Sequence, residues 1–400
     1  MHVIGRAHTV PRAGMTLFVL ALVGLLPRPS PAEPAQPPAV DLRHITVSEA
    51  GATAPVKGSD ERAVLTLDPK LQQASARLLA RANPVAGAVV AADARTGKVL
   101  VWVDRSRGRA RPGSVLLNRV APAASLFKIV TAAALLEKAQ IPPQTRVCTS
   151  GGQRGIERRH LEPPEQGQDR LCAPFSDALG HSRNAVFAQL ATRHLMRSDL
   201  VDMAAELGFN QAVPFDTKLP FGEVSVPYND LAFARTAAGF VGSRLSPLGA
   251  LELAYVIAAG GQTVQPRIVE RAGPYRAPSR RRVLRRVMTT WTARHLRRMM
   301  EVTVHSGTSL DVFSDQKGRS YLRGIRVAGK TGTLKRSANA PTTTWFVGFA
   351  PSTKPRVVVS VLVENGEVWR RKANEVARDV LRAYFADRGA AGVTHPLEND

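Results

Sequence analysis

The chain has 400 residues, of which 44% are hydrophobic, 22% charged and 6% aromatic. These proportions are ordinary for a globular protein and allow a core large enough for independent folding, in one large domain or in two or three smaller ones. The net charge of +23 is most concentrated from Arg276 to Arg298. Because no aromatic stacking platform or groove-reading motif accompanies these arginines, nucleic acid is excluded as an expected partner.

The first residues are typical of an export signal. Arg6 and Arg12 precede the apolar run from Met15 to Leu26, and several prolines follow it. At about 12 residues, this run is shorter than the roughly 20 that a membrane-spanning helix needs. We therefore predict a signal peptide over residues 1–32, with a short membrane anchor as the alternative, and a proline-rich linker over residues 33–61.

An exported protein would act in the periplasm or on the outer face of the cytoplasmic membrane. Anionic envelope polymers or lipid head groups would suit its basic surface there, although a solvated face in an arginine-rich protein is the plainer interpretation. Cys148 and Cys172 are the only cysteines of the chain. In an oxidising compartment we expect them to form a disulfide worth roughly 3 kcal/mol, rather than to be two unrelated buried thiols. Neither has the spacing of a metal site, and no cofactor is expected.

Hydrophobic periodicity predicts ordered elements from about residue 62 onwards. Strands are predicted at 64–67, 86–92, 99–103, 325–333, 343–349 and 355–363. Helices are predicted at 69–81, 125–138, 184–195, 200–207, 231–240, 247–259, 292–304 and 372–385. Strands at both ends with helices between them predict an α/β fold of the α+β type, in which one antiparallel sheet is flanked by helices. The domain would span residues 62–388, and a flexible tail would follow over 389–400.

Three short strings carry the chemistry of the chain. Ser125 and Lys128 are one helical turn apart, so the amine can reach the hydroxyl oxygen. Serine needs an adjacent base to become a nucleophile, and lysine can be that base only if burial or a cationic neighbour lowers its pKa. The strings Ser182-Arg183-Asn184 and Lys330-Thr331-Gly332-Thr333 would supply such neighbours and an anion-binding strand. Together they predict an acyl-transfer site.

Each string also has a plainer interpretation. Ser125 and Lys128 could lie on a solvated helix surface, although the helix around them is apolar. Residues 182–184 could merely cap the helix that follows. Lys330-Thr331-Gly332 could be an exposed strand end. The three strings occurring together and in this order favour the catalytic interpretation.

The three strings resemble the serine-x-x-lysine, serine-x-asparagine and lysine-threonine-glycine set of penicillin-binding proteins and β-lactamases. Further stretches resemble a penicillin-binding transpeptidase domain in the same order, from Leu65-Thr66-Leu67-Asp68 to Trp345-Phe346-Val347-Gly348-Phe349. Gly307-Thr308 is another such landmark. The resemblance spans roughly residues 62–386 and implies the penicillin-binding, β-lactamase-like transpeptidase fold.

The family implies a role for each matching position. Ser125 would be the acylated nucleophile and Lys128 its general base. Ser182 would relay a proton towards the leaving amine, and Asn184 would contact the peptide backbone of the substrate. Lys330 would hold Lys128 neutral and attract a carboxylate.

The strand of the third string would bind the substrate. Thr331 and Thr333 would hydrogen-bond the substrate carboxylate, and the backbone N–H groups of Ser125 and Thr333 would form the oxyanion hole. Gly332 would let a ligand backbone approach the strand closely.

Some positions depart from the family pattern. Pro122-Ala123-Ala124 precedes the nucleophile, whereas many penicillin-binding proteins have Pro-Gly directly before the serine. Class D β-lactamases share a Pro-Ala-Ser entrance but carry valine where this chain has Asn184. No Glu-x-x-Leu-Asn string follows Asn184, so the deacylating glutamate of class A β-lactamases has no candidate.

The resemblance implies a serine D,D-transpeptidase that acts on D-Ala-D-Ala stem peptides in peptidoglycan cross-linking, with β-lactams as covalent inhibitors. A D,D-carboxypeptidase or slow β-lactamase with the same site stays open, as does a non-catalytic envelope scaffold or sensor. Only about 60 residues precede the domain, too few for a glycosyltransferase. Such an activity would have to come from a separate partner protein, and the acceptor amine stays open.

Overall fold

The computed structural model describes residue 2 and residues 36–108, 113–118, 120–165 and 170–397. Residues 37–400 form one compact unit. The leader predicted over residues 1–32 lies, apart from His2, outside the described residues. Within the described ranges, no helix is long and apolar enough to cross a membrane.

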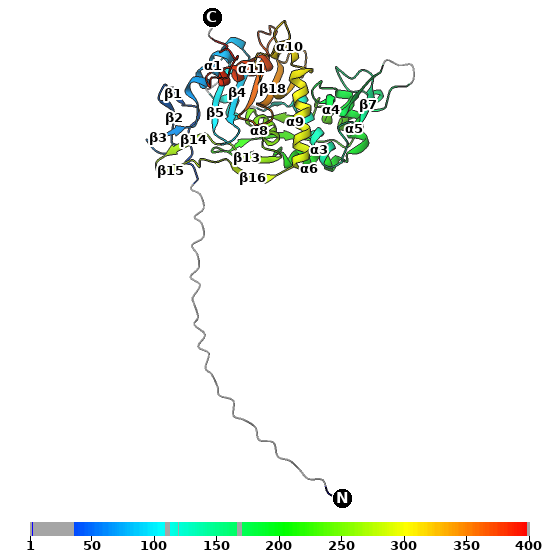
Figure 1. Ribbon diagram of the computed structural model, residues 1–400, viewed down its shortest axis with the longest axis horizontal. Coiled ribbons are helices and arrows are strands. Elements are labelled where there is room, and N and C mark those ends of the chain that lie inside the picture. Colours follow the sequence, from blue (N-terminus) through cyan, green and yellow to red (C-terminus); the bar gives the residue numbers. More distant parts are fainter. Residues whose placement is uncertain (1, 3–35, 109–112, 119, 166–169, 398–400) are drawn as a thin grey trace. The chain divides into compact units, whose positions relative to one another are not determined.

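A five-stranded antiparallel sheet lies at the centre of this unit (Figure 1). Its spatial order is β17-β18-β19-β4-β5, and every neighbouring pair is antiparallel. The bounds are Ala86–Asp93 for β4, Val99–Ser106 for β5, Ala328–Lys335 for β17, Thr342–Ala350 for β18 and Val357–Asn365 for β19. Both ends of the ordered chain therefore contribute strands, as the sequence predicts, and β17 is an edge strand.

Both faces of the sheet are buried. Along β4, Ala88 and Val90 belong to one hydrophobic cluster, whereas Val89 and Ala91 belong to the other. Neighbouring side chains of a strand point to opposite faces, so a sheet covered on both sides needs apolar residues at successive positions. This explains why the strands are continuous apolar runs in the sequence.

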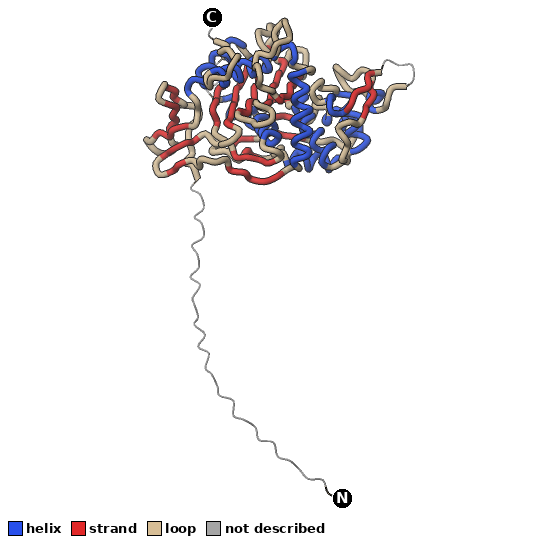
Figure 2. Tube along the Cα trace, in the orientation of Figure 1, coloured by secondary structure: helices blue, strands red, loops and turns tan. Residues whose placement is uncertain are grey.

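Helices cover the two faces, as Figures 1 and 2 show. One face packs against α1 (Pro69–Ala82), α10 (Leu310–Phe313) and α11 (Ala373–Ala386). The other packs against a larger set: α2 (Ser114–Asn118), α3 (Phe127–Glu137), α4 (Phe175–Ala178), α5 (Asn184–His194), α6 (Arg197–Glu206), α7 (Asp230–Ala237), α8 (Pro247–Ala258) and α9 (Thr290–His305). Helix α8 is buried from Pro247 to Ile257, and the Ser246 hydroxyl accepts the N–H of Gly249 at 3.0 Å to cap it.

Short strands form the periphery. They are β1 (Thr46–Ser48), β2 (Gly51–Pro55), β3 (Arg62–Leu65), β14 (Val269–Ala272) and β15 (Tyr275–Arg276) in one sheet; β6 (Ala121–Pro122), β11 (Gly222–Val224) and β12 (Ser243–Leu245) in another; and the pairs β7 (Arg146–Thr149) with β8 (Leu171–Pro174), β9 (Ala212–Val213) with β10 (Leu219–Pro220), and β13 (Gln262–Gln265) with β16 (Arg282–Arg286). Every residue of β16 is exposed, so this basic stretch is a solvated strand. Cys148 of β7 is disulfide-bonded to Cys172 of β8.

Two predicted boundaries are wrong. Residues 33–61 are not a linker throughout, because β1 and β2 pair with each other and β2 pairs with β3. Ala52 and Ala54 of β2 are 1% and 0% exposed, so small side chains that carry little hydrophobic signal nevertheless close a core. The tail after residue 388 is packed in its described part, since Val393 is buried in the hydrophobic cluster to which the buried residues of α11 belong.

Candidate active site

The segment that carries Ser125 is fixed from several sides. Ser125 lies in a 3-10 turn, Ala124–Leu126, that leads directly into α3. The indole N–H of Trp345 donates to the carbonyl oxygen of Pro122 at 2.8 Å, and the N–H of Ala123 donates to the carbonyl oxygen of Ser243 at 3.0 Å. Ala124 has a φ of 49°, a left-handed conformation that favours glycine. Alanine therefore adopts this conformation only with some backbone strain.

Lys128 lies one turn further along α3, beneath the serine. Its Nζ is hydrogen-bonded to Oγ of Ser125 at 2.7 Å, and its side chain is 0% exposed. The ring of Phe187 lies 5.9 Å from Nζ. Burial lowers the pKa of Lys128 well below its usual value, and the positive charge of Lys330 lowers it further. Burial and the neighbouring charge therefore both favour the neutral form of the amine that contacts the serine hydroxyl.

Lys330, on β17, is the second buried amine. Its Nζ donates to the carbonyl oxygen of Thr331 at 2.7 Å and to Oγ of Ser182 at 3.1 Å. Burial lowers its pKa from 10.5 to about 7. Ser182 lies in the turn between α4 and α5 with a φ of 55°. The strained turn thus brings a hydroxyl to the second amine.

Asn184 is the first residue of α5. Its Nδ2 donates to the carbonyl oxygens of Gly152 at 3.0 Å and Gln153 at 2.9 Å. Both amide hydrogens are therefore used by the loop before β8, and the side-chain oxygen is the group left to accept a hydrogen bond from a ligand. Arg183, at the N-cap position, makes no side-chain cap. The plainer interpretation of residues 182–184, as residues that merely cap α5, is therefore wrong.

A groove of about 570 Å³ joins these segments. The predicted site residues that line it are Ser125, Ser182, Asn184, Thr331, Gly332 and Thr333, and the two lysines lie buried below it. Gly332 faces Trp345 across the β17–β18 pair. A Cβ at Gly332 would lie 3.4 Å from both the carbonyl oxygen of Ala123 and Cβ of Ala124, so the strand runs in close contact with the nucleophile segment.

Sequence reasoning missed several residues at this groove. Oγ1 of Thr308 lies 2.6 Å from Oγ1 of Thr331, although the Gly307-Thr308 string had suggested no role. Lys372 and Asn374, at the start of α11, also line the groove, and nothing in an amphipathic helix pattern marks them. Within the described part of the chain, no group of three or more His, Cys, Asp or Glu side chains could hold a metal ion.

The chemistry follows from these contacts. A serine hydroxyl touches a desolvated amine, so its proton has an acceptor. The second amine, that of Lys330, has a pKa of about 7 and provides positive charge near neutral pH. The lining is rich in hydroxyl groups and basic side chains, and no Asp or Glu is among its described residues. Such a groove can bind an anionic carbonyl compound and transfer its acyl group to Ser125.

Comparisons with known proteins agree with this geometry. The family model of the penicillin binding protein transpeptidase domain matches residues 87–385. The peptidoglycan D,D-transpeptidase PbpA of Mycobacterium tuberculosis is 30% identical over 339 residues, which cover 75% of this chain and 67% of that protein.

Solved structures give the same result. An imipenem acyl-enzyme complex of M. tuberculosis penicillin-binding protein A has a TM-score of 0.66 and 26% identity, covering 82% of this chain and 81% of that one. The D,D-transpeptidase domain of a peptidoglycan glycosyltransferase from Eggerthella lenta also has a TM-score of 0.66, at 25% identity and coverage of 84% and 85%. The chain belongs to the penicillin-binding protein transpeptidase family.

Proposed function

We propose that this protein is a serine D,D-transpeptidase that cross-links peptidoglycan and is acylated by β-lactams. The observation that carries the proposal is the 2.7 Å contact between Oγ of Ser125 and the buried Nζ of Lys128. The membership in the transpeptidase family and the β-lactam acyl-enzyme complexes of a related protein support it.

The first half-reaction forms an ester on Ser125. Nζ of Lys128 takes the hydroxyl proton while Oγ bonds to the carbonyl carbon of the penultimate D-alanine. The C–N bond to the last D-alanine then breaks, and Ser182 relays the proton from Lys128 to the departing amine, so that both groups end the step in their starting protonation states. An acceptor amine attacks the ester in the second half-reaction, and the proton that it loses returns to Oγ of Ser125. The carbonyl oxygen would receive hydrogen bonds from the N–H groups of Ser125 and Thr333.

The carboxylate of the leaving residue would lie at the other end of the site. Thr331 and Thr333 are one strand period apart on β17, so their hydroxyl groups share one face. Protonated Lys330 lies behind them and would attract the carboxylate. The same three groups would bind the acid of a β-lactam. Since no carboxylate lines the described groove to activate water, a β-lactam ester on Ser125 should persist.

We also propose that the enzyme works outside the cytoplasm, in the periplasm or at the outer face of the cytoplasmic membrane. The disulfide between Cys148 and Cys172 supports an oxidising compartment. A separate glycosyltransferase would supply the glycan strands that it joins.

Labelling with a fluorescent penicillin tests the nucleophile. We expect one adduct, located on Ser125 by mass spectrometry of peptides, and no adduct on a Ser125→Ala variant. Ser337→Ala changes an exposed serine and serves as the control that keeps the label. An adduct on another residue, or none on the folded protein, would refute the acyl-enzyme.

Replacing the buried amine separates chemistry from folding. Lys128→Met keeps the length of the side chain and removes the base, so the rate of acylation by penicillin should fall on the order of 1000-fold. The melting temperature should stay the same or rise, because an apolar group replaces an amine that is costly to bury. Stopped-flow labelling and thermal denaturation measure the two effects. Near-normal labelling would show that another group removes the proton.

The pH dependence tests Lys330. Its pKa of about 7 lies far below that of an exposed lysine, so it is charged below that pH and loses its charge as pH rises through it. The second-order rate constant for acylation by penicillin should therefore decline above about pH 7, since the attraction of Lys330 for the carboxylate is lost. A thioester substrate without a carboxylate should show no such decline. Equal declines for both compounds would contradict this role.

The position of Ser125 depends on Gly239, which follows α7. A Cβ there would overlap the carbonyl group of Ala124 and lie 3.3 Å from Cα of Ser125. Gly239→Ala should therefore displace the nucleophile and lower the acylation rate by about 100-fold. Gly260→Ala is the matched control, since Gly260 also has a positive φ but has no atom within 4 Å of the added methyl group. Equal rates in the two variants would show that this contact does not hold the serine in place.

A further inference from the structure

A second groove, of about 1250 Å³, continues from the catalytic one. The two share four lining residues, Gln153, Phe240, Thr333 and Leu334, so a ligand can pass from one to the other. No role of the second groove follows from the acyl-transfer chemistry, because within the described ranges the hydrogen bonds of Ser125, Lys128 and Lys330 involve none of its other lining residues.

Strand β17 connects the two grooves. Thr331 and Thr333 line the catalytic groove, whereas Thr333, Lys335 and Arg336 line the second one. A strand rises about 3.3 Å per residue, so Thr331 and Lys335 are roughly 13 Å apart on the same face. Because β17 is an edge strand, an extended peptide can lie along it. With its C-terminal carboxylate near Thr331 and Lys330, such a peptide would direct its preceding residues into the second groove.

The walls of the second groove are strongly basic. Five basic and two acidic side chains line it: Arg154, Arg235, Arg244, Lys335, Arg336, Glu157 and Glu223. Within the described ranges, none of the five basic groups forms an ion pair with a carboxylate, whereas Glu157 pairs outside the groove with Arg159 at 3.1 Å. Glu223 lies opposite Arg244 in the β11–β12 pair and offsets part of its charge. The groove therefore has an excess of positive charge.

Two of the arginines are held in position by backbone oxygens. Nε of Arg235 donates to the carbonyl oxygen of Ile156 at 2.8 Å, and a terminal nitrogen of Arg244 donates to that of Val120 at 2.6 Å. These bonds order the side chains without neutralising them. Arg235 keeps its terminal nitrogens for a carboxylate, in the forked geometry that guanidinium groups favour.

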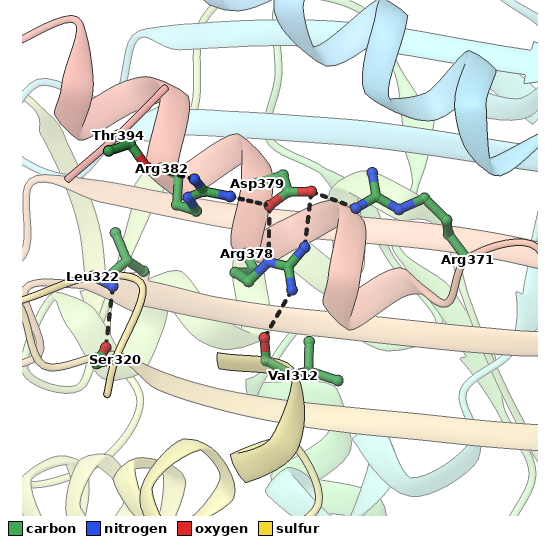
Figure 3. A network of polar contacts seen from close by, with 8 residues as sticks. All are labelled: Val312, Ser320, Leu322, Arg371, Arg378, Asp379, Arg382 and Thr394. Carbon is green, nitrogen blue, oxygen red and sulfur yellow. Dashed lines mark hydrogen bonds and ion pairs between the residues drawn. The ribbon is translucent and has the colours of Figure 1, made fainter. Parts of the chain in front are cut away.

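The opposite side of the groove is formed by the loop between β19 and α11. Trp369 of this loop lines the groove and is 40% exposed. Arg371, two residues further along, donates to the buried carboxylate of Asp379 at 2.5 Å, and Figure 3 shows Arg378 and Arg382 on the same carboxylate. These contacts tie the loop to α11, and Trp369 provides an apolar surface for the backbone of a ligand.

We propose that this basic groove binds the acidic part of the donor peptide, the residues that precede the cleaved D-Ala-D-Ala bond. The inference rests on the proposed transpeptidase function and specifies its substrate: an extended peptide with side-chain carboxylates two to four residues before its C-terminus. Of the five basic residues, Lys335, the last residue of β17, and Arg336, which follows it, come soonest after Thr333 along the chain, and they are the residues expected to distinguish an acidic donor from a neutral one. Penicillin has no such extension and does not reach them.

The test compares two synthetic pentapeptides that end in D-Ala-D-Ala. One has glutamate at its first three positions and the other has glutamine there, and the release of D-alanine gives kcat/KM for each. The wild-type protein should prefer the glutamate peptide by about 10-fold, and Lys335→Glu/Arg336→Glu should reverse this preference. For the double variant, the glutamine peptide and penicillin should react within about threefold of wild type. Added salt should weaken the preference, because these groups are exposed.

A matched double variant controls for net charge. Lys70→Glu/Arg77→Glu makes the same charge change on α1, which packs on β5 at the far edge of the sheet from β17. It should keep the preference for the glutamate peptide. Equal rates for the two peptides with wild-type protein, or equal losses in both double variants, would overturn the groove assignment. Failure of penicillin to label Ser125 would instead refute the proposed function, so the two failures are distinguishable.

Discussion

The site depends on the burial of two lysines side by side. Both Lys128 and Lys330 are 0% exposed, and a positive charge on Lys330 disfavours a positive charge on Lys128. Keeping Lys330 protonated in this surrounding costs roughly 5 kcal/mol relative to water, which is the size of a small domain's whole stability. Such an arrangement persists only where a large, rigid structure holds it. The same burial makes the site reactive, because it lowers the pKa of Lys128, the amine in contact with the serine, well below its usual value.

The fold provides the rigidity at the points where the chain is strained. Ala124 and Ser182 both have positive φ, and each lies at or next to a reactive hydroxyl group. Three unconnected parts of the chain meet here: the turn before α3, the turn before α5 and the edge strand β17. The hydrogen bond from Trp345 to Pro122 and the close approach of Gly332 link the first of these to the sheet. Helices on both faces of the sheet then prevent the strained turns from relaxing.

The sequence predicts those parts of the protein whose residues have few alternatives. Continuous apolar runs predict the buried strands, and the three catalytic strings occur in an order that ordinary surface residues do not produce together. Prediction fails where the signal is weak or distant. Strand β2 consists of Gly, Ala, Thr and Pro, which are typical of a linker, and its burial depends on partners elsewhere in the chain. The contacts of Asn184 with Gly152 and Gln153 likewise depend on a loop whose position no local pattern specifies.

The two grooves use positive charge in different ways. Behind the catalytic groove the charge of Lys330 is buried, so solvent ions screen it little, and its protonation state controls the chemistry. In the second groove Lys335 and Arg336 are exposed, so their charges lie in water and act over a distance that salt shortens. A buried charge can thus select for the carboxylate that the peptide substrates and penicillins share, whereas an exposed cluster can only favour one donor over another. This difference between the buried charge of one groove and the exposed charges of the other follows from solvation alone. It allows donor preference to change without altering the reaction at Ser125.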